Sequence, residues 1–460
     1  MSAQRESLAS RLGFILVSAG CAIGLGNIWR FPFIVGKYGG AIFVLLYLLF
    51  LAIIAFPVLM TEMTVGRGSQ SNIVHGFHKL AHSHKCAWAI LGAILLTGCL
   101  ILMMYYTTIT GWLLLYTKDY VCGNFHNAAA AGQNFGDIFG NLASNPGLSA
   151  FGMILTCLIG GLVCAMGVEK GVENVVKFLM LALFILILVL AGYAMTLPNA
   201  AEGLKFYLLP NWGNFIQKPL ETIFAALGQA FFTLSIGIGS MEIFGSYLSW
   251  KTSMAKECLF IIILDTFVAL SAGLIIFPVC ASNGIDVSAG PSLIFISLPG
   301  IFQTLPGGQF WGALFFAFLF LAAITTVIAV FENLVAFPID AKWMGRKASA
   351  LLITVAVIVL SMPCVLGFGP WKGFQPLGEG TGVLDLEDFI VSQNLLPLGA
   401  VCFLIFCGCA AGWGFSNFKQ ELEAGQTWHF PKWILFYWRF LLPIIILAIC
   451  VLGYWALFFK

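Results

Sequence analysis

Residues 18–32 combine glycines, a polar amide and a charge inside an apolar segment. The run contains Gly20, Gly24, Gly26, Asn27 and Arg30. Each glycine costs about 1 kcal/mol relative to alanine in a helix interior, and a charge near the centre of a bilayer is expensive. A membrane helix leaves its helical path only where the backbone is buried in protein or lines a wet cavity. We therefore expect a broken helix here, with a binding site at the break.

A second apolar segment, 221–248, carries a similar interruption. Gly237-Ile-Gly239 repeats the spacing of Gly24-Leu-Gly26, and polar residues precede it in both segments. A glycine pair in one membrane helix usually serves close packing against another helix. Two interrupted segments, five spans apart, indicate instead two inverted halves that share one site near mid-membrane.

The composition places these segments in a membrane protein. The chain of 460 residues is 60% hydrophobic and 9% charged, with a net charge of +2, whereas soluble domains are about 45–50% apolar and 25% charged. The small net charge gives no indication of nucleic-acid binding. The 13 cysteines are scattered through apolar segments, which is typical of cysteine used as a small hydrophobic residue and not of a disulfide framework.

Eleven apolar runs are long enough to cross a bilayer. They cover residues 11–37, 41–65, 88–117, 149–167, 174–197, 221–248, 257–280, 309–340, 349–366, 390–413 and 433–458. We therefore expect one all-α polytopic transporter domain over 1–460, with repeat one at 11–197, repeat two at 221–413 and a last helix at 433–458. A shorter apolar stretch, 291–305, is predicted to be an external loop helix.

The distribution of Lys and Arg predicts the orientation. With the N-terminus inside, fifteen of the 22 Lys and Arg residues fall on the inner side, six fall on the outer side, and Arg30 lies within the membrane. The N-terminus is therefore expected to be cytoplasmic. With eleven spans, the C-terminus is expected to be external.

Four motifs together resemble the neurotransmitter:sodium symporter family. Residues 11–40, with Gly24-Leu-Gly-Asn-Ile-Trp-Arg-Phe-Pro, are similar to the family's first helix, and 231–239 resemble its sixth helix. Tyr105-Tyr106 resembles the third helix and Thr325-Thr326 the eighth. The resemblance implies a five-plus-five inverted repeat, as in the bacterial leucine transporter, with helices 1 and 6 unwound at mid-membrane. It also implies a prokaryotic plasma (inner) membrane protein similar to the transporters of hydrophobic and aromatic amino acids.

The resemblance implies a substrate site between spans one, three, six and eight. Amides at Leu25 and Gly26 and the hydroxyl of Tyr106 are expected to hold a substrate carboxylate. Gly24 stands where monoamine carriers of the family have aspartate, so the substrate is expected to bring its own negative charge. The largely apolar pocket predicts a hydrophobic amino acid. The expected contacts are Ala22, Gly24, Leu25, Gly26, Leu102, Tyr106, Phe232, Ser235, Ile238, Thr326 and Val330.

Two sodium sites are also implied by the resemblance, and both use only oxygen ligands. The first consists of the Ala22 carbonyl, Asn27, Thr233 and Asp265, completed by the substrate carboxylate. The second consists of the carbonyls of Gly20, Ile23 and Ala322 and the hydroxyls of Thr325 and Thr326. Adjacent threonines in a membrane helix more often bond to their own helix carbonyls, so this alternative stays open.

Asp265 also bears on the role of chloride. Many relatives have asparagine at this position, and Ala269, one helical turn later, stands where chloride-dependent members have serine. The built-in carboxylate and the missing hydroxyl predict transport without chloride. A neutral Asp265, or one that faces another buried group, is the alternative.

Two gates are expected from the same resemblance. Arg30 is similar to the outer-gate arginine, with Asp388 as its partner and Gln393 or Asn394 as alternatives. At the inner side, Arg5 and Asp340 match the family's latch, with Tyr247 beside it, although both charges could simply extend to water. Leu8 replaces the usual tryptophan of this gate. Glu62, Glu242 and Glu332 belong either to a proton path or to acids bonded to backbone amides.

We therefore predict a sodium-coupled symporter that imports hydrophobic L-amino acids by alternating access, with two sodium ions and no chloride requirement. Its other expected partner is the lipid bilayer, and it is expected to be a monomer or a loose homodimer. No nucleotide loop, nucleophile triad or HExxH motif indicates an enzyme. A carrier of an osmolyte or amine, and a channel or substrate sensor on the same scaffold, are the alternatives.

Overall fold

The computed structural model describes residues 8–210, 212–284, 293–427 and 429–458, and its regular structure there is helical apart from one β-bridge between Gly40 and Pro210. The α-helices are α1 (Arg11–Ala22), α2 (Phe31–Lys37), α3 (Ala41–Phe50), α4 (Phe56–Ser69), α5 (Ile73–Leu80), α6 (Lys85–Val121), α7 (Asn124–Ala130), α8 (Phe135–Ser144), α9 (Pro146–Ala165), α10 (Asn174–Ala194), α11 (Ala200–Leu208), α12 (Trp212–Gln217), α13 (Pro219–Thr233), α14 (Ser240–Gly245), α15 (Met254–Ser282), α16 (Leu298–Thr304), α17 (Gly308–Asp340), α18 (Arg346–Gly367), α19 (Val383–Asp388), α20 (Leu396–Gly408), α21 (Phe415–Glu423), α22 (Lys432–Phe436) and α23 (Leu442–Phe458). Short π-helical segments connect several of them, among them Gly26–Arg30 and Phe389–Leu395.

Nine of the eleven predicted spans are helices that are long and apolar enough to cross a membrane within the described ranges. The first predicted span is a bent pair, Arg11–Ala22 and Gly26–Lys37, which makes ten if the pair is one crossing. The remaining span, 221–248, is divided into α13 of 15 residues and α14 of six, so neither part has the length to cross alone. The polytopic all-helical class is confirmed. The count of eleven crossings and the division into two repeats stay predictions.

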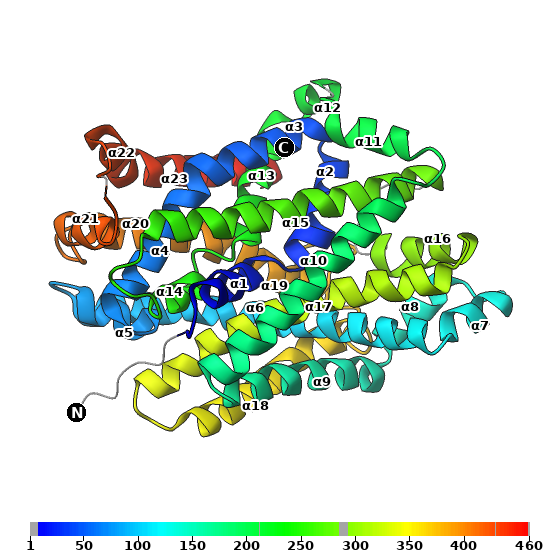
Figure 1. The fold of residues 1–460 in the computed structure, drawn as a ribbon, viewed down its shortest axis with the longest axis horizontal. Coiled ribbons are helices and arrows are strands. Elements are labelled where there is room, and N and C mark those ends of the chain that lie inside the picture. Colours follow the sequence, from blue (N-terminus) through cyan, green and yellow to red (C-terminus); the bar gives the residue numbers. More distant parts are fainter. Residues whose placement is uncertain (1–7, 211, 285–292, 428, 459–460) are drawn as a thin grey trace.

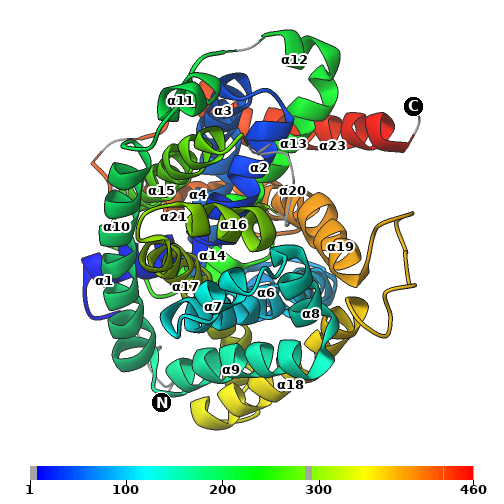
Figure 2. The same cartoon turned by 90° about the vertical axis from the view of Figure 1, so that its right-hand side faces the viewer.

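The long helices run roughly parallel to one another (Figure 1), and α6 and α17 lie inside the bundle when it is viewed end-on (Figure 2). In the most apolar stretch of α17, 78% of the residues are buried, against 28% for the span that contains α10. Large apolar side chains are exposed along α9, α10, α18 and α23. A surface of this kind is stable against lipid, where no water competes for backbone hydrogen bonds. The outer helices therefore form the lipid-facing wall around a buried centre.

The two ends of the bundle carry different short helices. At one end lie α5 and α21, and at the other lie α7, α8 and α16 (left and right in Figure 1). We call them the α5 end and the α7 end; the sequence predicts that they face the cytoplasm and the outside, respectively. The predicted loop helix at 291–305 is present over Leu293–Thr304 within the described residues, and α16 is part of it.

The first predicted break is present between α1 and the π-helical segment that begins at Gly26. The chain leaves the helix at Ile23 and Gly24, and the two halves meet at an angle of 53°. Carbonyl groups at the end of α1 lose their helical partners there. Side chains of the second interrupted span bond to carbonyls on both sides of the break: the Ser235 hydroxyl donates to the Cys21 carbonyl over 3.3 Å, and the Gln229 amide donates to the Gly26 carbonyl over 2.8 Å. The second broken helix therefore braces the first.

The second break lies between α13 and α14, where residues 234–239 form turns. Gly237 has a φ of +100°, and a Cβ at this position would lie 2.1 Å from the Leu396 carbonyl oxygen of α20, so only glycine fits. The buried carboxylate of Glu62, from α4, accepts the amide of Gly237 over 2.7 Å and that of Met241 over 3.0 Å. An anion at the start of α14 satisfies amides that have no helical partner and complements the helix dipole.

Replacing Glu62 by glutamine should lower the free energy of unfolding by about 1–3 kcal/mol, because one acceptor of a buried amide becomes a donor. The measurement is thermal unfolding of the purified protein in detergent. Thr117→Val is the matched control, since within the described part of the chain the Thr117 hydroxyl bonds to the Leu113 carbonyl of its own helix and to no other group. An unchanged melting temperature for Glu62→Gln would contradict a supporting role for Glu62 at the second break.

Candidate substrate and ion site

The break in the first span lies directly against Tyr106 and Thr326. The amide of Leu25 donates a hydrogen bond to the Tyr106 hydroxyl oxygen over 2.9 Å. A Cβ on Gly24 would lie 2.3 Å from that oxygen and 2.6 Å from the Thr326 hydroxyl oxygen, closer than real Cβ contacts allow. Glycine at position 24 therefore lets the backbone of the first span approach α6 and α17 at the same point.

A small cavity lies between the two broken helices. It is lined by Ala22, Gly24, Gly26, Leu102, Tyr106, Phe232, Ser235, Thr326, Val391 and Leu396. Eight of the eleven predicted substrate contacts are in this set. The volume open to the centre of a water molecule is about 10 Å³, which is room for about one water. A larger solute can enter only when the lining side chains move apart.

Three predicted contacts do not line the cavity. Leu25 participates through its backbone amide, as described above. Ile238 is buried against α6: its Cγ2 lies 2.8 Å from where a Cβ of Gly98 would stand, and its carbonyl accepts the Cys99 thiol over 3.3 Å. Val330 is fully buried in α17. In this closed arrangement Ile238 therefore packs against α6 and does not line the cavity.

Two lining residues, Val391 and Leu396, were missed by the sequence analysis. Both belong to the predicted tenth span, which was considered only for the gate. Val391 lies in the π-helical segment Phe389–Leu395, where the spacing of a regular helix does not predict side-chain direction, so no spacing signal identified it. Nothing in the sequence pointed to Leu396, which reaches the cavity through the close approach of α20 to Gly237.

The residues of the first predicted sodium site are brought together around Asp265. The Asn27 side-chain amide donates to Asp265 Oδ1 over 2.7 Å, and the Thr233 hydroxyl donates to Asp265 Oδ2 over 3.0 Å. Asn27 Oδ1 in turn accepts the amide of Gly24 over 3.1 Å. All of these side chains are fully buried, and Ala22 lines the adjacent cavity. The carboxylate of Asp265, the hydroxyl of Thr233 and the amide oxygen of Asn27 are oxygen ligands of the kind that suit a hard cation.

The residues of the second predicted site also converge. The Thr326 hydroxyl lies 3.2 Å from the carbonyl oxygens of both Gly20 and Ile23 and 3.4 Å from that of Ala322. The Thr325 hydroxyl donates to the Ala322 carbonyl over 2.8 Å. Thr325 thus bonds within its own helix, as the alternative allowed. Thr326 reaches across to the broken end of α1, so its hydroxyl lies close to three carbonyl oxygens, two from the first span and one from α17.

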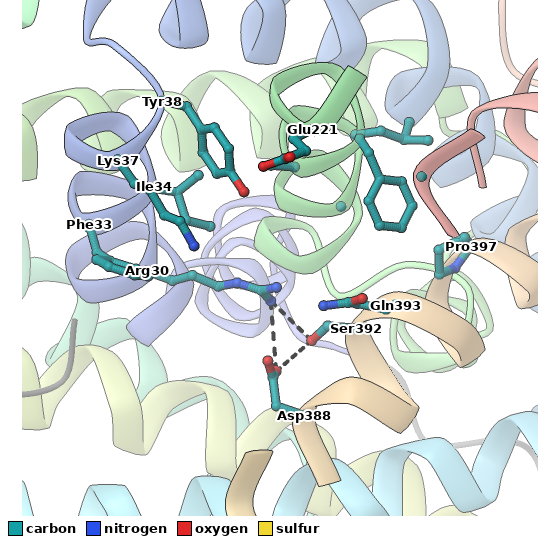
Figure 3. A pocket seen from close by; sticks show the side chains of 15 residues that line it. Arg30, Phe33, Ile34, Lys37, Tyr38, Glu221, Asp388, Ser392, Gln393 and Pro397 are labelled. Carbon is teal, nitrogen blue, oxygen red and sulfur yellow. Dashed lines mark hydrogen bonds and ion pairs between the residues drawn. The ribbon is translucent and has the colours of Figure 1, made fainter. Parts of the chain in front are cut away.

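Arg30 and Asp388, the residues predicted to form the outer gate, lie close together (Figure 3). Arg30 Nη1 lies 3.8 Å from Asp388 Oδ1 and donates to the Ser392 hydroxyl over 3.0 Å, while that hydroxyl donates to Asp388 over 2.6 Å. The Tyr105 hydroxyl donates to the same Asp388 oxygen over 3.1 Å. Of the two alternatives, the Asn394 amide bonds to the Phe389 carbonyl of its own helix, and Gln393 lines a cavity together with Arg30 and Asp388. Ser392, one turn after Asp388, was missed by the sequence analysis.

The gate separates the small cavity from two larger ones at its α7-end side. The Arg30 guanidinium lies 4.3 Å above the centre of the Phe232 ring, and this ring lines the small cavity. The larger cavities have about 210 and 190 Å³ open to water centres, and both are lined by Arg30, Phe33 and Asp388. We call them together the vestibule. The inner cavity is therefore closed off from the vestibule by an ion pair that rests on an aromatic ring.

At the α5 end, Asp340 and Tyr247 take partners that the sequence analysis did not name. Arg5 lies outside the described residues. Asp340 Oδ2 accepts the backbone amide of Asn72 over 2.6 Å and its side-chain amide over 2.8 Å. Tyr247 donates to Glu332 over 2.7 Å, and Glu332 pairs with Arg346 over 2.8 Å.

Glu62 and Glu332 are therefore bonded acids within the described structure. Glu62 follows the second alternative of the sequence analysis, because it accepts backbone amides. Glu332 is instead held in an ion pair with Arg346. Glu242 Oε1 accepts the Ser69 hydroxyl over 3.3 Å.

A helical membrane protein with two broken spans around oxygen-lined sites is a carrier of small solutes by its architecture. The comparisons with known proteins define the family. The model of the "Sodium:neurotransmitter symporter family" matches residues 5–129 and 134–457. The chain therefore belongs to this family, whose members are sodium-dependent membrane transporters and not enzymes.

Individual relatives support this assignment. The chain is 33% identical to an uncharacterized sodium-dependent transporter, YhdH, of Bacillus subtilis, over 96% of each protein. It is 27% identical to the sodium- and chloride-dependent taurine transporter of Rattus norvegicus, over 97% of this chain and 77% of that protein. Among solved structures, MhsT in complex with L-phenylalanine matches with a TM-score of 0.87 and 35% identity, covering 98% of this chain and 100% of that one.

Proposed function

We propose that this protein is a symporter that imports hydrophobic L-amino acids with sodium. The observation that carries the proposal is that two lining residues of the small cavity belong to the predicted ion sites or bond to them: the Gly24 amide bonds to Asn27 of the Asp265 cluster, and Thr326 bonds to the Gly20 and Ile23 carbonyls. Gly24, which faces the cavity, supplies no charge, so an anionic substrate group would supply the missing ligand between Tyr106 and the first sodium ion. A shared ligand of this kind makes the binding of sodium and substrate mutually dependent.

The character of the cavity favours a hydrophobic side chain. Leu102, Phe232, Val391 and Leu396 line it, together with the polar residues Tyr106, Ser235 and Thr326. The structure of MhsT in complex with L-phenylalanine gives a precedent for an aromatic amino acid in a similar protein. An osmolyte carrier is the second candidate because relatives include a taurine transporter. Against this apolar lining, a compact polar solute would find few partners for its polar groups.

A competition experiment tests the substrate class. Binding of labelled L-phenylalanine to the purified protein in sodium chloride should be displaced by L-leucine, L-tryptophan and L-isoleucine and not by taurine, glycine or dopamine. Replacing sodium by potassium should abolish binding. Displacement by taurine with no effect of the hydrophobic amino acids would favour the osmolyte carrier instead.

Transport should not require chloride. The buried carboxylate of Asp265 supplies the negative charge beside the first sodium site, and Ala269 has no hydroxyl to hold an anion. Uptake should therefore be unchanged within about twofold when chloride is replaced by gluconate. Loss of uptake in gluconate would show that the chloride dependence named for the taurine relatives extends to this chain.

Two sodium ions would provide ample driving force. Each ion gains roughly 2.3 kcal/mol from 100 mV and about 1.4 kcal/mol from a tenfold gradient. Two ions together give roughly 7 kcal/mol, which corresponds to a maximum ratio of internal to external substrate of about 10⁵. One ion would give about 500-fold, so the accumulation ratio distinguishes the two stoichiometries.

The predicted orientation, with the α7 end outside, can be tested with two native cysteines. Cys86 and Cys122 are exposed, and they lie near opposite ends of α6, about 54 Å apart along the helix axis. A membrane-impermeant maleimide applied to intact cells should label Cys122, and Cys86 only after the membrane is opened. Cys122→Ser and Cys86→Ser variants identify the labelled residue. The reverse pattern would overturn the orientation.

A further inference from the structure

Glu387 is a buried acid next to the outer gate, and neither the gate nor the sodium sites use it. It precedes Asp388 at the end of α19, a helix that packs against α6 and α18. Only 4% of Glu387 is exposed. Figure 3 shows Asp388 turned toward Arg30 and Ser392. Successive side chains on a helix point about 100° apart, so the side chain of Glu387 points in a different direction from that of Asp388.

By hydrogen-bond geometry neither carboxyl oxygen of Glu387 has a partner among the described residues; the polar group beside it is the Cys364 thiol, which is only a weak donor. Native structures leave few buried polar groups unpaired, and each such group needs an explanation. An ionised carboxylate without partners in a membrane interior is strongly disfavoured, whereas a protonated carboxyl is neutral. The arrangement therefore suits the protonated form.

The groups around Glu387 do not supply a compensating positive charge. Cys364 of α18 is its polar neighbour, and Thr108 of α6 bonds to the Met104 carbonyl of its own helix. The other acids nearby are Asp385, which bonds to the Gly382 amide, and Asp388. The cation nearest in the network is Arg30, which is engaged with Asp388 and Ser392.

We propose that Glu387 is a proton-binding site linked to the outer gate: it holds a proton while Arg30 and Asp388 are paired and releases it to the vestibule when they part. Asp388 and Glu387 are consecutive residues of one short helix, so a movement that separates Asp388 from Arg30 also moves Glu387. Once α19 has moved and water reaches Glu387, hydration stabilises the carboxylate form. On opening, the O–H bond of the carboxyl group breaks and the proton passes to external water; on closing, the reverse step takes up one proton.

The proton enters and leaves on the same side in this scheme, so no proton is carried across the membrane. Gate closure instead depends on external pH. Because the closed gate binds one proton more than the open gate, acid favours closure. As pH rises through the range in which the closed form holds this proton and the open form does not, the ratio of closed to open protein falls by up to tenfold per pH unit.

Infrared spectroscopy of the purified protein in lipid tests the protonation state directly. The spectrum at neutral pH should contain the carbonyl band of a protonated carboxylic acid that disappears in Glu387→Gln. Asp385→Asn is the matched control, because Asp385 is an exposed acid on the same helix, and this change should leave the band intact. If the wild-type and Glu387→Gln spectra show no difference in this band, the proposal is overturned.

The link to the gate requires a second measurement. Phe33 lines both cavities of the vestibule, so Phe33→Cys, in a Cys86→Ser and Cys122→Ser background, reports opening through its reaction with an impermeant maleimide. The rate of Phe33→Cys labelling should rise with pH in both proteins. The rise should be steeper with Glu387 present than in Glu387→Gln, and the difference should be up to tenfold per pH unit. The Glu387→Gln background corrects for the reactivity of the thiol itself.

Glu387→Leu serves as a second neutral variant if the glutamine protein folds poorly, and the same loss of pH dependence is expected. Equal pH profiles with and without Glu387 would overturn the link to the gate. Both measurements are made without a transported substrate, so their failure does not bear on the proposed amino-acid transport.

Discussion

Replacing Asp265 by asparagine should raise the sodium concentration for half-maximal uptake at least about tenfold. The carboxylate lies at the centre of the predicted first sodium site, where it accepts hydrogen bonds from Asn27 and Thr233. Asparagine keeps the shape and one acceptor oxygen but removes the negative charge. A tenfold change corresponds to only about 1.4 kcal/mol, which is modest for a fully buried charge beside a cation.

The matched control for this prediction is Asp385→Asn, which removes an exposed carboxylate that lines the vestibule and not the small cavity. Its sodium dependence should stay within about twofold of the wild type. The measurement is initial uptake of labelled L-phenylalanine over a range of sodium concentrations at constant ionic strength. Sodium curves that coincide for Asp265→Asn and the wild type would show that Asp265 is not a sodium ligand.

Replacing Gly24 by alanine should reduce substrate binding by about 100-fold or more. The added methyl group would lie 2.3 Å from the Tyr106 hydroxyl oxygen and 2.6 Å from that of Thr326. Either α6 and α17 move away from the first span, or the backbone around Gly24 adopts another conformation. Both outcomes displace groups expected to hold the substrate carboxylate, and overpacking of this kind typically costs 1–3 kcal/mol before any binding contact is lost.

Gly192→Ala is the control for the glycine substitution. Gly192 is a helical glycine of α10, and a Cβ there meets nothing within 4 Å, so alanine should be neutral or slightly stabilising. Equilibrium binding of labelled L-phenylalanine, with folding checked by thermal unfolding, measures both variants. Binding by Gly24→Ala that equals the wild type would contradict a close approach of the break to Tyr106.

The positions of both breaks could be predicted because glycines and polar residues in an apolar segment conflict with a continuous helix. Gly24 and Gly237 show why the conflict is resolved locally: other backbone or side-chain atoms occupy the space of a Cβ at each position. Asp265 could be placed beside Asn27 and Thr233 through the family resemblance alone. No periodicity in the sequence relates residues on three separate segments.

The tenth span shows where the prediction reached its limit. The segment Phe389–Leu395 is π-helical, which shifts the side-chain register relative to a regular helix. Sequence spacing could therefore not decide between Asp388, Gln393 and Asn394 as the partner of Arg30, and it did not identify Ser392. Partners that depend on tertiary packing, such as the bond from Tyr247 to Glu332, are equally invisible to local patterns.

The most direct test of the account is accumulation in proteoliposomes. The purified protein, reconstituted with an inward sodium gradient and an inside-negative potential, should concentrate labelled L-phenylalanine far above its external level, and dissipating the sodium gradient should release it. An equal potassium gradient should give no accumulation. Saturable, sodium-independent binding without accumulation would contradict sodium-coupled transport and would favour a substrate sensor on the same fold.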